Sequence, residues 1–273
     1  MPIPIGKLGK KPAKIDPRTL KLSKYLADDI PAAPLNVDYT MGITDFGMML
    51  NGPNTYGNGV PSDGLGNCTI CTLAHAEQIW SAAARDTEMT PSDSMVLERY
   101  EDWCGYVLGD ESTDNGGIEI AVMNAWRRKQ INAFRLEMFA DPNPTNLGEV
   151  KQAIHLFGAM NIGIALPVSV QGASTWDISS GPNAIPGSWG LHSALVCGYI
   201  TNADGTITLI CVSWGQIIYI TQAFWTYMDP SAGPYIDEAH AMISKEFINR
   251  KSGTNPVGLN LAGMEKDALA VTG

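Results

Sequence analysis

The segment Cys68–Arg85 constrains the fold of this chain more than any other stretch. It contains neither glycine nor proline, and its apolar residues fall around most of a helix circumference at about 100° per residue. A helix that is apolar nearly all round is buried in the middle of a domain. The preceding Gly64-Leu65-Gly66-Asn67 is a turn signal. The sequence therefore predicts a central buried helix over 68–85 that begins at Cys68.

Helical patterns fill the first half of the chain and strand patterns fill the second. A second helix is predicted to open at 90–93, with Thr90 as its N-cap and Pro91 at its first helical position. Helices first and antiparallel strands later are typical of an α+β domain. The other predicted elements are helices over 117–130 and 146–157 and strands over 161–167, 193–200, 206–212, 216–221 and 239–243.

One hairpin brings two distant segments together. Residues 201–205 carry turn residues, so paired residue numbers in the flanking strands should sum to about 407. His192 then lies opposite residue 215, to within a residue or two. We expect His192 and the segment Val212-Ser213-Trp214-Gly215 to be neighbours.

The two ends of the chain lack the periodicity of its middle. Residues 1–35 form a basic, proline-rich arm, whose first 25 residues carry a net charge of +6 against −16 for the remainder. Residues 252–273 are weakly patterned and are predicted to be a tail. Neither end is expected to bury much. The arm is either a contact for an acidic partner or a solvated segment.

Charge and hydropathy exclude several function classes. An acidic body lacks the clustered cations that phosphate contacts need, which predicts no nucleic-acid partner. No apolar run is long enough to cross a bilayer, which predicts no membrane partner. The N-terminus has no apolar core of signal-peptide length. We therefore expect that the protein is not secreted by the signal-peptide route.

The five cysteines are odd in number and do not suggest a disulfide framework. Cys68-Thr69-Ile70-Cys71 leaves open a redox pair or half of a metal site, but no second pair or suitably spaced histidine completes a zinc motif. We predict no metal and no cofactor. The remaining polar candidates are His75, His155 and His240, read as structural, and Asp110, Glu111 and Asp114, read as a solvated loop with calcium as the alternative.

Cys68 and His192 are the residues best suited to chemistry. The positive end of a helix dipole favours a thiolate, and free backbone N–H groups there can hold an oxyanion. His192 opens a strand after a Gly/Pro-rich loop and is the candidate base. This arrangement is typical of a Cys–His hydrolase. The alternative reading of Cys68 is a purely structural cysteine.

Several stretches, in family order over roughly residues 36–245, resemble landmarks of the papain-like cysteine peptidases. Asn36–Tyr39, Pro91–Leu97 and 150–165 resemble three of these landmarks. The four most telling are Leu65-Gly66-Asn67-Cys68-Thr69 (“LGSCT”), Asn115-Gly116-Gly117 (“NGG”), His192-Ser193-Ala194-Leu195-Val196-Cys197-Gly198-Tyr199 (“HAVLVVGY”) and Ser213-Trp214-Gly215 (“NSWG”). The chain is most similar to a divergent bacterial or bacteriophage branch. Together with the absence of a predicted signal peptide, this resemblance implies a location in the bacterial cytoplasm or in a virion.

The resemblance implies roles for individual residues. Cys68 would be the nucleophile and His192 its base, resting as a thiolate–imidazolium pair, with Trp214 as a shield against water. Two positions depart from the family. Val212 stands where the family has the asparagine that orients the histidine, so the expected substitute is Ser213 or a backbone carbonyl. Ser62, next to Asp63, stands where the family has its oxyanion glutamine.

We therefore predict a papain-like α+β domain over 36–251, with a helical half, an antiparallel barrel-like half and a cleft between Cys68 and His192. Two functions remain open. The first is a cysteine peptidase or related amide hydrolase acting on a peptide or protein. The second is a catalytically weak or inactive structural protein, built into a phage particle or other assembly through partners of 1–35 and 252–273. The short arm is expected to tether rather than inhibit.

Overall fold

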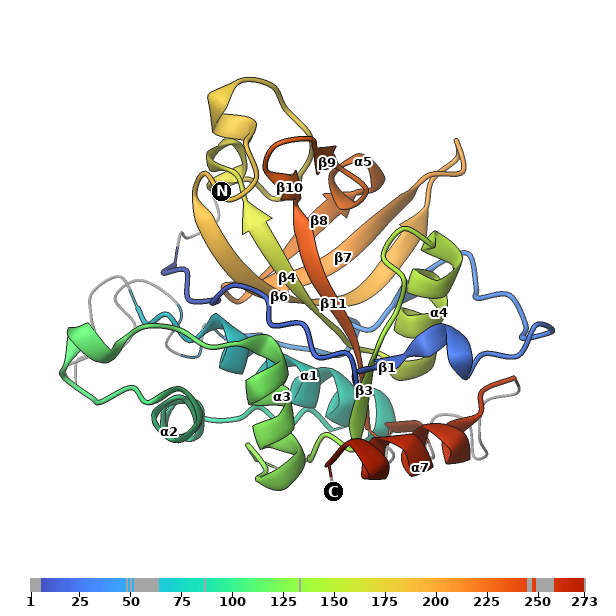
Figure 1. The fold of residues 1–273 in the computed structure, drawn as a ribbon, viewed down its shortest axis with the longest axis horizontal. Helices are drawn as coiled ribbons and strands as arrows, with labels where there is room; N and C mark the ends of the chain where they lie inside the picture. The colour runs from blue at the N-terminus through green and yellow to red at the C-terminus, as the bar shows by residue number, and fades with distance from the viewer. Residues whose placement is uncertain are drawn as a thin grey trace.

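The computed structural model describes residues 6–47, 49, 51, 64–85, 87–132, 134–244, 247–248 and 258–272. Figure 1 shows helices α1, α2 and α3 below a strongly twisted sheet, with the dark-blue N-terminal segment running between the two layers. Among the helices of these residues, none combines the length and the apolar content that crossing a bilayer requires.

Helix α1 (Cys68–Arg85) has the predicted bounds and the predicted burial. Trp80 lies at its centre, stacks on Trp126 with ring centroids 5.4 Å apart, and donates its Nε1–H to the Phe157 carbonyl at 2.8 Å. α1 packs against the long strand β6 (Gly190–Thr201). Because of this packing, the start of α1 at Cys68 lies close to the start of β6, which contains His192.

The other predicted helices are present with small changes. They are α2 (Asp93–Cys104), α3 (Glu119–Arg128) and α4 (Leu147–Phe157). The predicted start of α2 was wrong by two residues. Ser92 is the N-cap, because its hydroxyl accepts from the Met95 N–H, and Thr90 and Pro91 precede the helix.

Nine strands of the described residues form one sheet in the order β1-β3-β11-β4-β6-β7-β8-β5, with β2 also paired to β6. The sheet is antiparallel except at its two edges, where β1–β3 and β5–β8 are parallel, so the expected purely antiparallel sheet was wrong there. The strands not yet bounded are β1 (Leu20–Lys21), β2 (Val37–Asp38), β3 (Met138–Asp141), β4 (Met160–Leu166), β5 (Thr175–Trp176), β7 (Ile207–Ser213), β8 (Gln216–Thr221) and β11 (Ile236–Ile243).

Smaller elements connect these strands. β9 (Met228–Asp229) and β10 (Gly233–Pro234) form a separate hairpin, and α5 (Gln222–Trp225) follows β8. The 3-10 turns are η1 (Leu22–Lys24), η2 (Glu111–Thr113), η3 (Val168–Val170) and η4 (Pro182–Ala184). Within the N-terminal arm, the short η1 directly follows β1.

The hairpin register confirms the prediction. Leu195 pairs with Val212, so the two residue numbers add up to the predicted sum of about 407. A bulge between Val196 and Gly198 shifts the remaining pairs by one residue. β7 and β8 are joined by Trp214 and Gly215, both with positive φ, 49° and 69°. Two such residues make the tight turn whose twist suits a hairpin.

Both ends of the chain bury more than predicted. Leu22 and Tyr25 of the N-terminal arm lie in the core, and the Tyr25 hydroxyl donates to Asp267 at 2.8 Å. The C-terminal segment is not an extended tail, because Leu261–Thr272 form helix α7. Its buried residues Leu261, Met264 and Ala268 follow helical spacing and pack near β1 and β3.

Candidate active site

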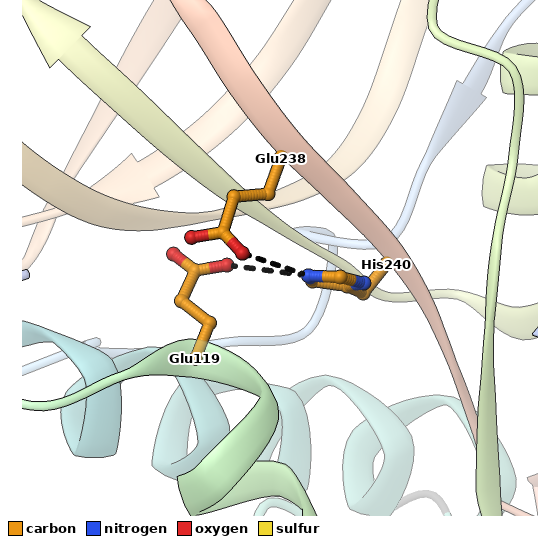
Figure 2. A group of neighbouring side chains, drawn as sticks. All are labelled: Glu119, Glu238 and His240. Carbon is orange, nitrogen blue, oxygen red and sulfur yellow. Dashed lines mark ion pairs between the residues drawn. The ribbon is translucent and has the colours of Figure 1, made fainter. Parts of the chain in front are cut away.

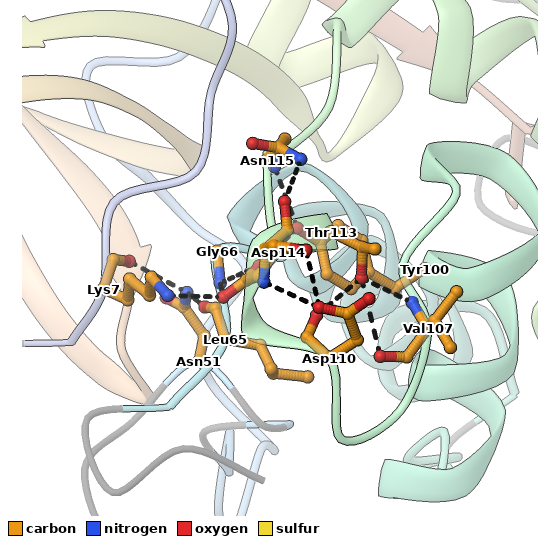
Figure 3. Close-up of polar contacts among 12 residues, drawn as sticks. Lys7, Asn51, Leu65, Gly66, Tyr100, Val107, Asp110, Thr113, Asp114 and Asn115 are labelled. Atoms are coloured by element: carbon orange, nitrogen blue, oxygen red, sulfur yellow. Dashed lines mark hydrogen bonds and ion pairs between the residues drawn. The ribbon is translucent and has the colours of Figure 1, made fainter.

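The turn before Cys68 is held by a buried carboxylate. Both oxygens of Asp114 accept the Gly66 N–H, at 3.0 and 3.1 Å, and one accepts the Tyr100 hydroxyl at 2.6 Å (Figure 3). The Asp114 side chain is fully buried, so the expectation of a solvated loop was wrong for this residue. Asp114 thereby fixes the backbone that presents Cys68 at the start of α1.

His192 is held by two residues of the β7–β8 turn. Its Nε2 lies 2.7 Å from the Ser213 Oγ, and Trp214 stacks on the imidazole with centroids 4.3 Å apart and an angle of 14°. The other ring nitrogen, Nδ1, has no hydrogen-bond partner within the described part of the chain. Ser213 therefore contacts the nitrogen that Val212 could not engage.

The structure brings the predicted pair together. Cys68 and His192 line one cavity of about 10 Å³, with Asn51, Ser213 and Trp214 also in its wall. A space of this size holds about one water molecule. Ser62 and its neighbour Asp63 lie outside the described residues.

The chain's own N-terminal arm packs against residues that line this cavity: Gly6 lies against Asn51 and Trp214, and the Gly9 backbone lies against Cys68. The Lys11 N–H donates to the Gly117 carbonyl and the Gly117 N–H donates to the Gly9 carbonyl, both at 2.8 Å. The Lys10 N–H donates to the Leu191 carbonyl at 3.3 Å. A methyl group on Gly9 would lie 1.8 Å from the Gly66 carbonyl oxygen, so only glycine fits there. The expectation that the arm buries little was therefore wrong for residues 9–11.

Two further contacts hold the arm at Lys7, close to the first described residue. Lys7 Nζ forms an ion pair with Asp114 at 2.7 Å, and the Lys7 carbonyl accepts from the Asn51 side-chain amide at 3.1 Å (Figure 3). The bound segment is therefore an extended peptide, fixed mainly through its backbone, that crosses the start of α1.

Burial under the arm changes the charge state of both groups. It raises the pKa of the Cys68 thiol to about 12, although hydrogen bonds to the backbone of Ser193 and Gly9 act in the opposite direction. Burial also lowers the pKa of His192 to about 3. In the covered state the pair is therefore a neutral thiol and a neutral imidazole, not the charged pair that the resemblance implied.

Asn51 is a site residue that sequence reasoning missed. Its side chain is almost fully buried, and its amide also donates to the Leu65 carbonyl at 2.8 Å. It stands in a Gly/Asn/Pro-rich stretch, where asparagine usually marks a turn. No local pattern separates such a residue from one that lines a cavity.

The second thiol of the C-x-x-C sequence has a packing role. The Cys71 Sγ lies 3.3 Å from the Met49 carbonyl and 3.4 Å from the Asn67 side-chain oxygen, and burial raises its pKa well above the ordinary value. All five cysteines are free.

A second group of ionisable side chains lies farther along the arm. Glu119 of α3 and Glu238 and His240 of β11 come together, with the two carboxylates pointing toward each other in Figure 2. His240 Nε2 lies 3.5 Å from Glu238 and 3.9 Å from Glu119, and its Nδ1 lies 2.6 Å from Asp141. His240 was predicted to be structural, and no signal marked this cluster because its members are far apart in the chain.

The charge balance of the cluster is set by burial and by its partners. Burial and the nearby Glu238 raise the pKa of Glu119 to about 8. Burial opposes the charged form of His240, but Asp141, Glu238 and Glu119 outweigh it and raise its pKa to about 9. Glu119, Glu238 and His240 offer ligand atoms within 4.8 Å of one another, a set that would suit a divalent cation.

Comparison of the sequence with protein-family models and with curated proteins finds no match. The fold does match solved structures. Xylellain, a cysteine protease from Xylella fastidiosa, superposes with a TM-score of 0.60 at 13% identity, over 88% of this chain and 97% of that one. Digestive procathepsin L 3 from the Tenebrio molitor larval midgut gives 0.56 at 12% identity, over 85% and 75%.

The bromelain protease from Ananas comosus, in complex with the E64 inhibitor, gives a TM-score of 0.51 at 13% identity, over 77% of this chain and 99% of that one. Identities this low bear on the fold alone. The predicted papain-like α+β fold is confirmed.

Proposed function

We propose that this chain is a cysteine peptidase or related amide hydrolase that uses Cys68 and His192 and is covered by its own N-terminal arm. One observation carries the proposal: an extended peptide segment, held by backbone hydrogen bonds to Gly117 and Leu191, lies against Cys68, which shares a cavity with His192. Backbone hydrogen bonds do not depend on side chains, so a substrate peptide that replaces the arm can use the same partners.

The chemistry begins once the arm has left. His192 Nδ1 accepts the thiol proton, and the Cys68 sulfur forms a bond to the substrate carbonyl carbon. The C–N bond then breaks and the leaving amine takes the proton from His192. Water, deprotonated by the same nitrogen, attacks the thioester, and breaking the C–S bond restores the thiol.

The residues around Cys68 and His192 support these reaction steps. The Ser213 Oγ holds the Nε2 edge of His192, so the ring presents Nδ1 to the cavity. Trp214 covers the ring face and excludes water. The N–H of Cys68, at the start of a helix, is one oxyanion donor. The Asn51 amide, which already donates to a peptide carbonyl of the arm, is the second.

The covered state is inactive on this proposal. A thiol with a pKa of about 12 beside an imidazole with a pKa of about 3 does not exchange its proton. Removing the arm admits water to both groups and lets the thiolate and imidazolium stabilise each other. The arm is therefore an inhibitory segment of the same chain.

A second candidate is a catalytically weak protein with a structural role, which two observations favour. Val212 stands in place of the family's asparagine, and the cavity shared by Cys68 and His192 measures only about 10 Å³. On this alternative the arm stays in place and assembly partners bind the terminal segments.

Alkylation of cysteines in the full chain distinguishes the hydrolase from the structural protein. Gly9→Ala forces the arm away from the Gly66 carbonyl, so an iodoacetamide-type reagent should label Cys68 rapidly near pH 6, where an ordinary thiol is almost fully protonated. The unaltered chain should label slowly at the same pH. Adding His192→Ala to the Gly9→Ala chain should move labelling to above about pH 8.

Gly148→Ala is the matched control, because its new methyl group meets the Asn146 side-chain oxygen at 3.3 Å and does not displace the arm from the Gly66 carbonyl. It should label as slowly as the unaltered chain. Labelling of the Gly9→Ala chain only above pH 8, with no cleavage of a broad set of peptides, would contradict the peptidase and favour the structural role.

A further inference from the structure

The arm places one cation deep inside the molecule. The Lys10 side chain is fully buried, and its Nζ lies 2.8 Å from both Asp237 and Glu238. Its backbone sits next to Gly9, the residue that lies over Cys68. Lys10 is thus a side chain of a peptide in the candidate cleft, seated in an acidic pocket.

The pocket is shaped as well as charged. A methyl group on Gly163 would lie 2.3 Å from the Lys10 Cε and 2.5 Å from the Asp237 Oδ1, so the missing side chain makes room for the lysine stem. Gly163 belongs to β4, and Asp237 and Glu238 belong to β11, so rigid strands form the walls.

The floor of the pocket holds an unsatisfied carboxylate. Glu119 is fully buried; its Oε2 accepts from Asn161 at 3.1 Å, while its Oε1 accepts no hydrogen bond among the described residues. Three carboxylates converge here, and His240 is the cation that remains when Lys10 leaves. Emptying the pocket leaves buried negative charge that attracts a new cation.

We propose that this pocket, formed by Gly163, Asp237, Glu238 and Glu119, is a recognition site for a lysine or arginine side chain of the substrate. The side chain belongs to the residue next to the one that lies over Cys68, and Lys10 occupies the site in the covered state. This inference rests on the proposed hydrolase, whose substrate class it narrows to basic peptides.

A peptide side chain fits the pocket better than a metal ion. The ammonium of Lys10 already makes two ion pairs there while its backbone donates to Leu191, so both halves of the residue are engaged. His240 carries a raised pKa beside these carboxylates, and a protonated imidazole repels a metal ion.

A peptide-binding experiment tests the proposed site for a basic side chain without requiring turnover. The protein is the full chain carrying Gly9→Ala, Lys10→Ala and Cys68→Ala, which loosens the arm and prevents cleavage. The probe is a fluorescently labelled peptide with the sequence of residues 6–12, compared with versions carrying Lys10→Met or Lys11→Met. Lys11 is the matched control, because it makes no ion pair with the described residues.

The Lys10→Met peptide should bind about 10- to 100-fold more weakly in fluorescence anisotropy, as expected for loss of hydrogen bonds to a charged group. The Lys11→Met peptide should bind within a few-fold of the original. Adding Glu238→Gln to the protein should reduce the preference for Lys10 over methionine. Equal binding of the Lys10 and Lys10→Met peptides would overturn the proposal, as would tighter binding of Zn²⁺ to the emptied pocket with no lysine preference.

The two proposals fail separately. If the Gly9→Ala chain cleaves no peptide but the lysine preference holds, the hydrolase is wrong and the basic-side-chain site stands. If that chain cleaves peptides with and without a basic residue equally well, the hydrolase stands and the site is wrong.

Discussion

His192 contacts a serine where the papain-like family that the sequence resembles has an asparagine. Val212 pairs with Leu195 and Ile217 in the sheet, and its side chain has no hydrogen-bonding group. The next residue, Ser213, ends β7, where it pairs with Gln216, and its hydroxyl lies 2.7 Å from the Nε2 of His192. A shift of one residue thus preserves an acceptor for the ring.

Ser213→Ala, made in the Gly9→Ala chain, should lower kcat about 10- to 100-fold with little change in KM, because the ring loses a hydrogen bond to its charged form. Steady-state kinetics on a basic peptide measure this. Ser231→Ala, in the distant β9–β10 hairpin, is the control and should leave both constants unchanged. A rise in KM with kcat intact would contradict an orienting role.

Asn51→Ala in the same background should lower kcat about 10²- to 10³-fold, because one oxyanion donor is lost. Single-turnover kinetics on an activated ester and on an amide would measure the effect on acylation directly. Asn115→Ala is the control, because the Asn115 amide donates only to the Ser112 carbonyl in an exposed loop. Unchanged kinetics for Asn51→Ala would assign the oxyanion site to another group.

At the scale of single elements, α1 links the site to the core. Its first residue is the candidate nucleophile and its middle carries Trp80, which is stacked on Trp126 of α3 and bonded to the end of α4. The position of Cys68 therefore depends on packing more than 10 residues away from it along the helix.

Trp80→Ala should lower the free energy of unfolding by about 3–5 kcal/mol, because it removes a fully buried aromatic side chain and leaves a cavity. Urea unfolding of the full chain, followed by far-UV circular dichroism, checks this. Trp103→Ala is the control: Trp103 is half-buried in α2, where it stacks under Arg99, and its loss should cost clearly less. Equal costs would contradict a central role for α1.

Across the whole molecule, the acidic cluster ties together segments from both ends of the chain. Lys10 of the arm meets Asp237 and Glu238 of β11 across 227 residues of sequence, and Glu119 joins them from α3. The network extends through His240 and Asp141 to Lys21 of β1. Its protonation therefore affects the assembly of the entire fold.

Stability should fall as pH rises from 6.5 to 9. Glu119 has a folded-state pKa raised to about 8, so its contribution is complete below its unfolded value and is lost as it ionises. His240 is raised to about 9, so its contribution is complete below about 6.5 and is lost as it deprotonates. The groups facing them are Lys10, Asp141, Asp237 and Glu238.

Urea unfolding at both pH values should show a loss on the order of 3 kcal/mol for the unaltered chain. His240→Gln should be less stable at pH 6.5 but lose much less over the same interval, since its side chain does not titrate. The same loss in both proteins would show that other groups cause the pH dependence.

The elements that could be predicted from sequence are those with a strong local pattern. α1 repeats apolar residues over 18 residues, and β7 and β8 are strand-like runs on either side of a turn. All three elements were therefore predicted with nearly correct bounds. β1, β2 and β5 are two residues long and carry no period that a sequence can display. α7 was missed because its apolar residues follow a stretch without periodic pattern.

The sequence by itself determined the central helix, the hairpin register and hence the proximity of His192 to Ser213 and Trp214, because periodicity and turn residues act over short distances along the chain. Only the tertiary structure decided that Cys68 and His192 line one cavity, and what surrounds that pair. The arm in the cleft, the buried Asp114 and the Lys10 pocket all depend on contacts between segments far apart in sequence. The energy of such contacts comes from burial and charge in the assembled molecule, which no local pattern records.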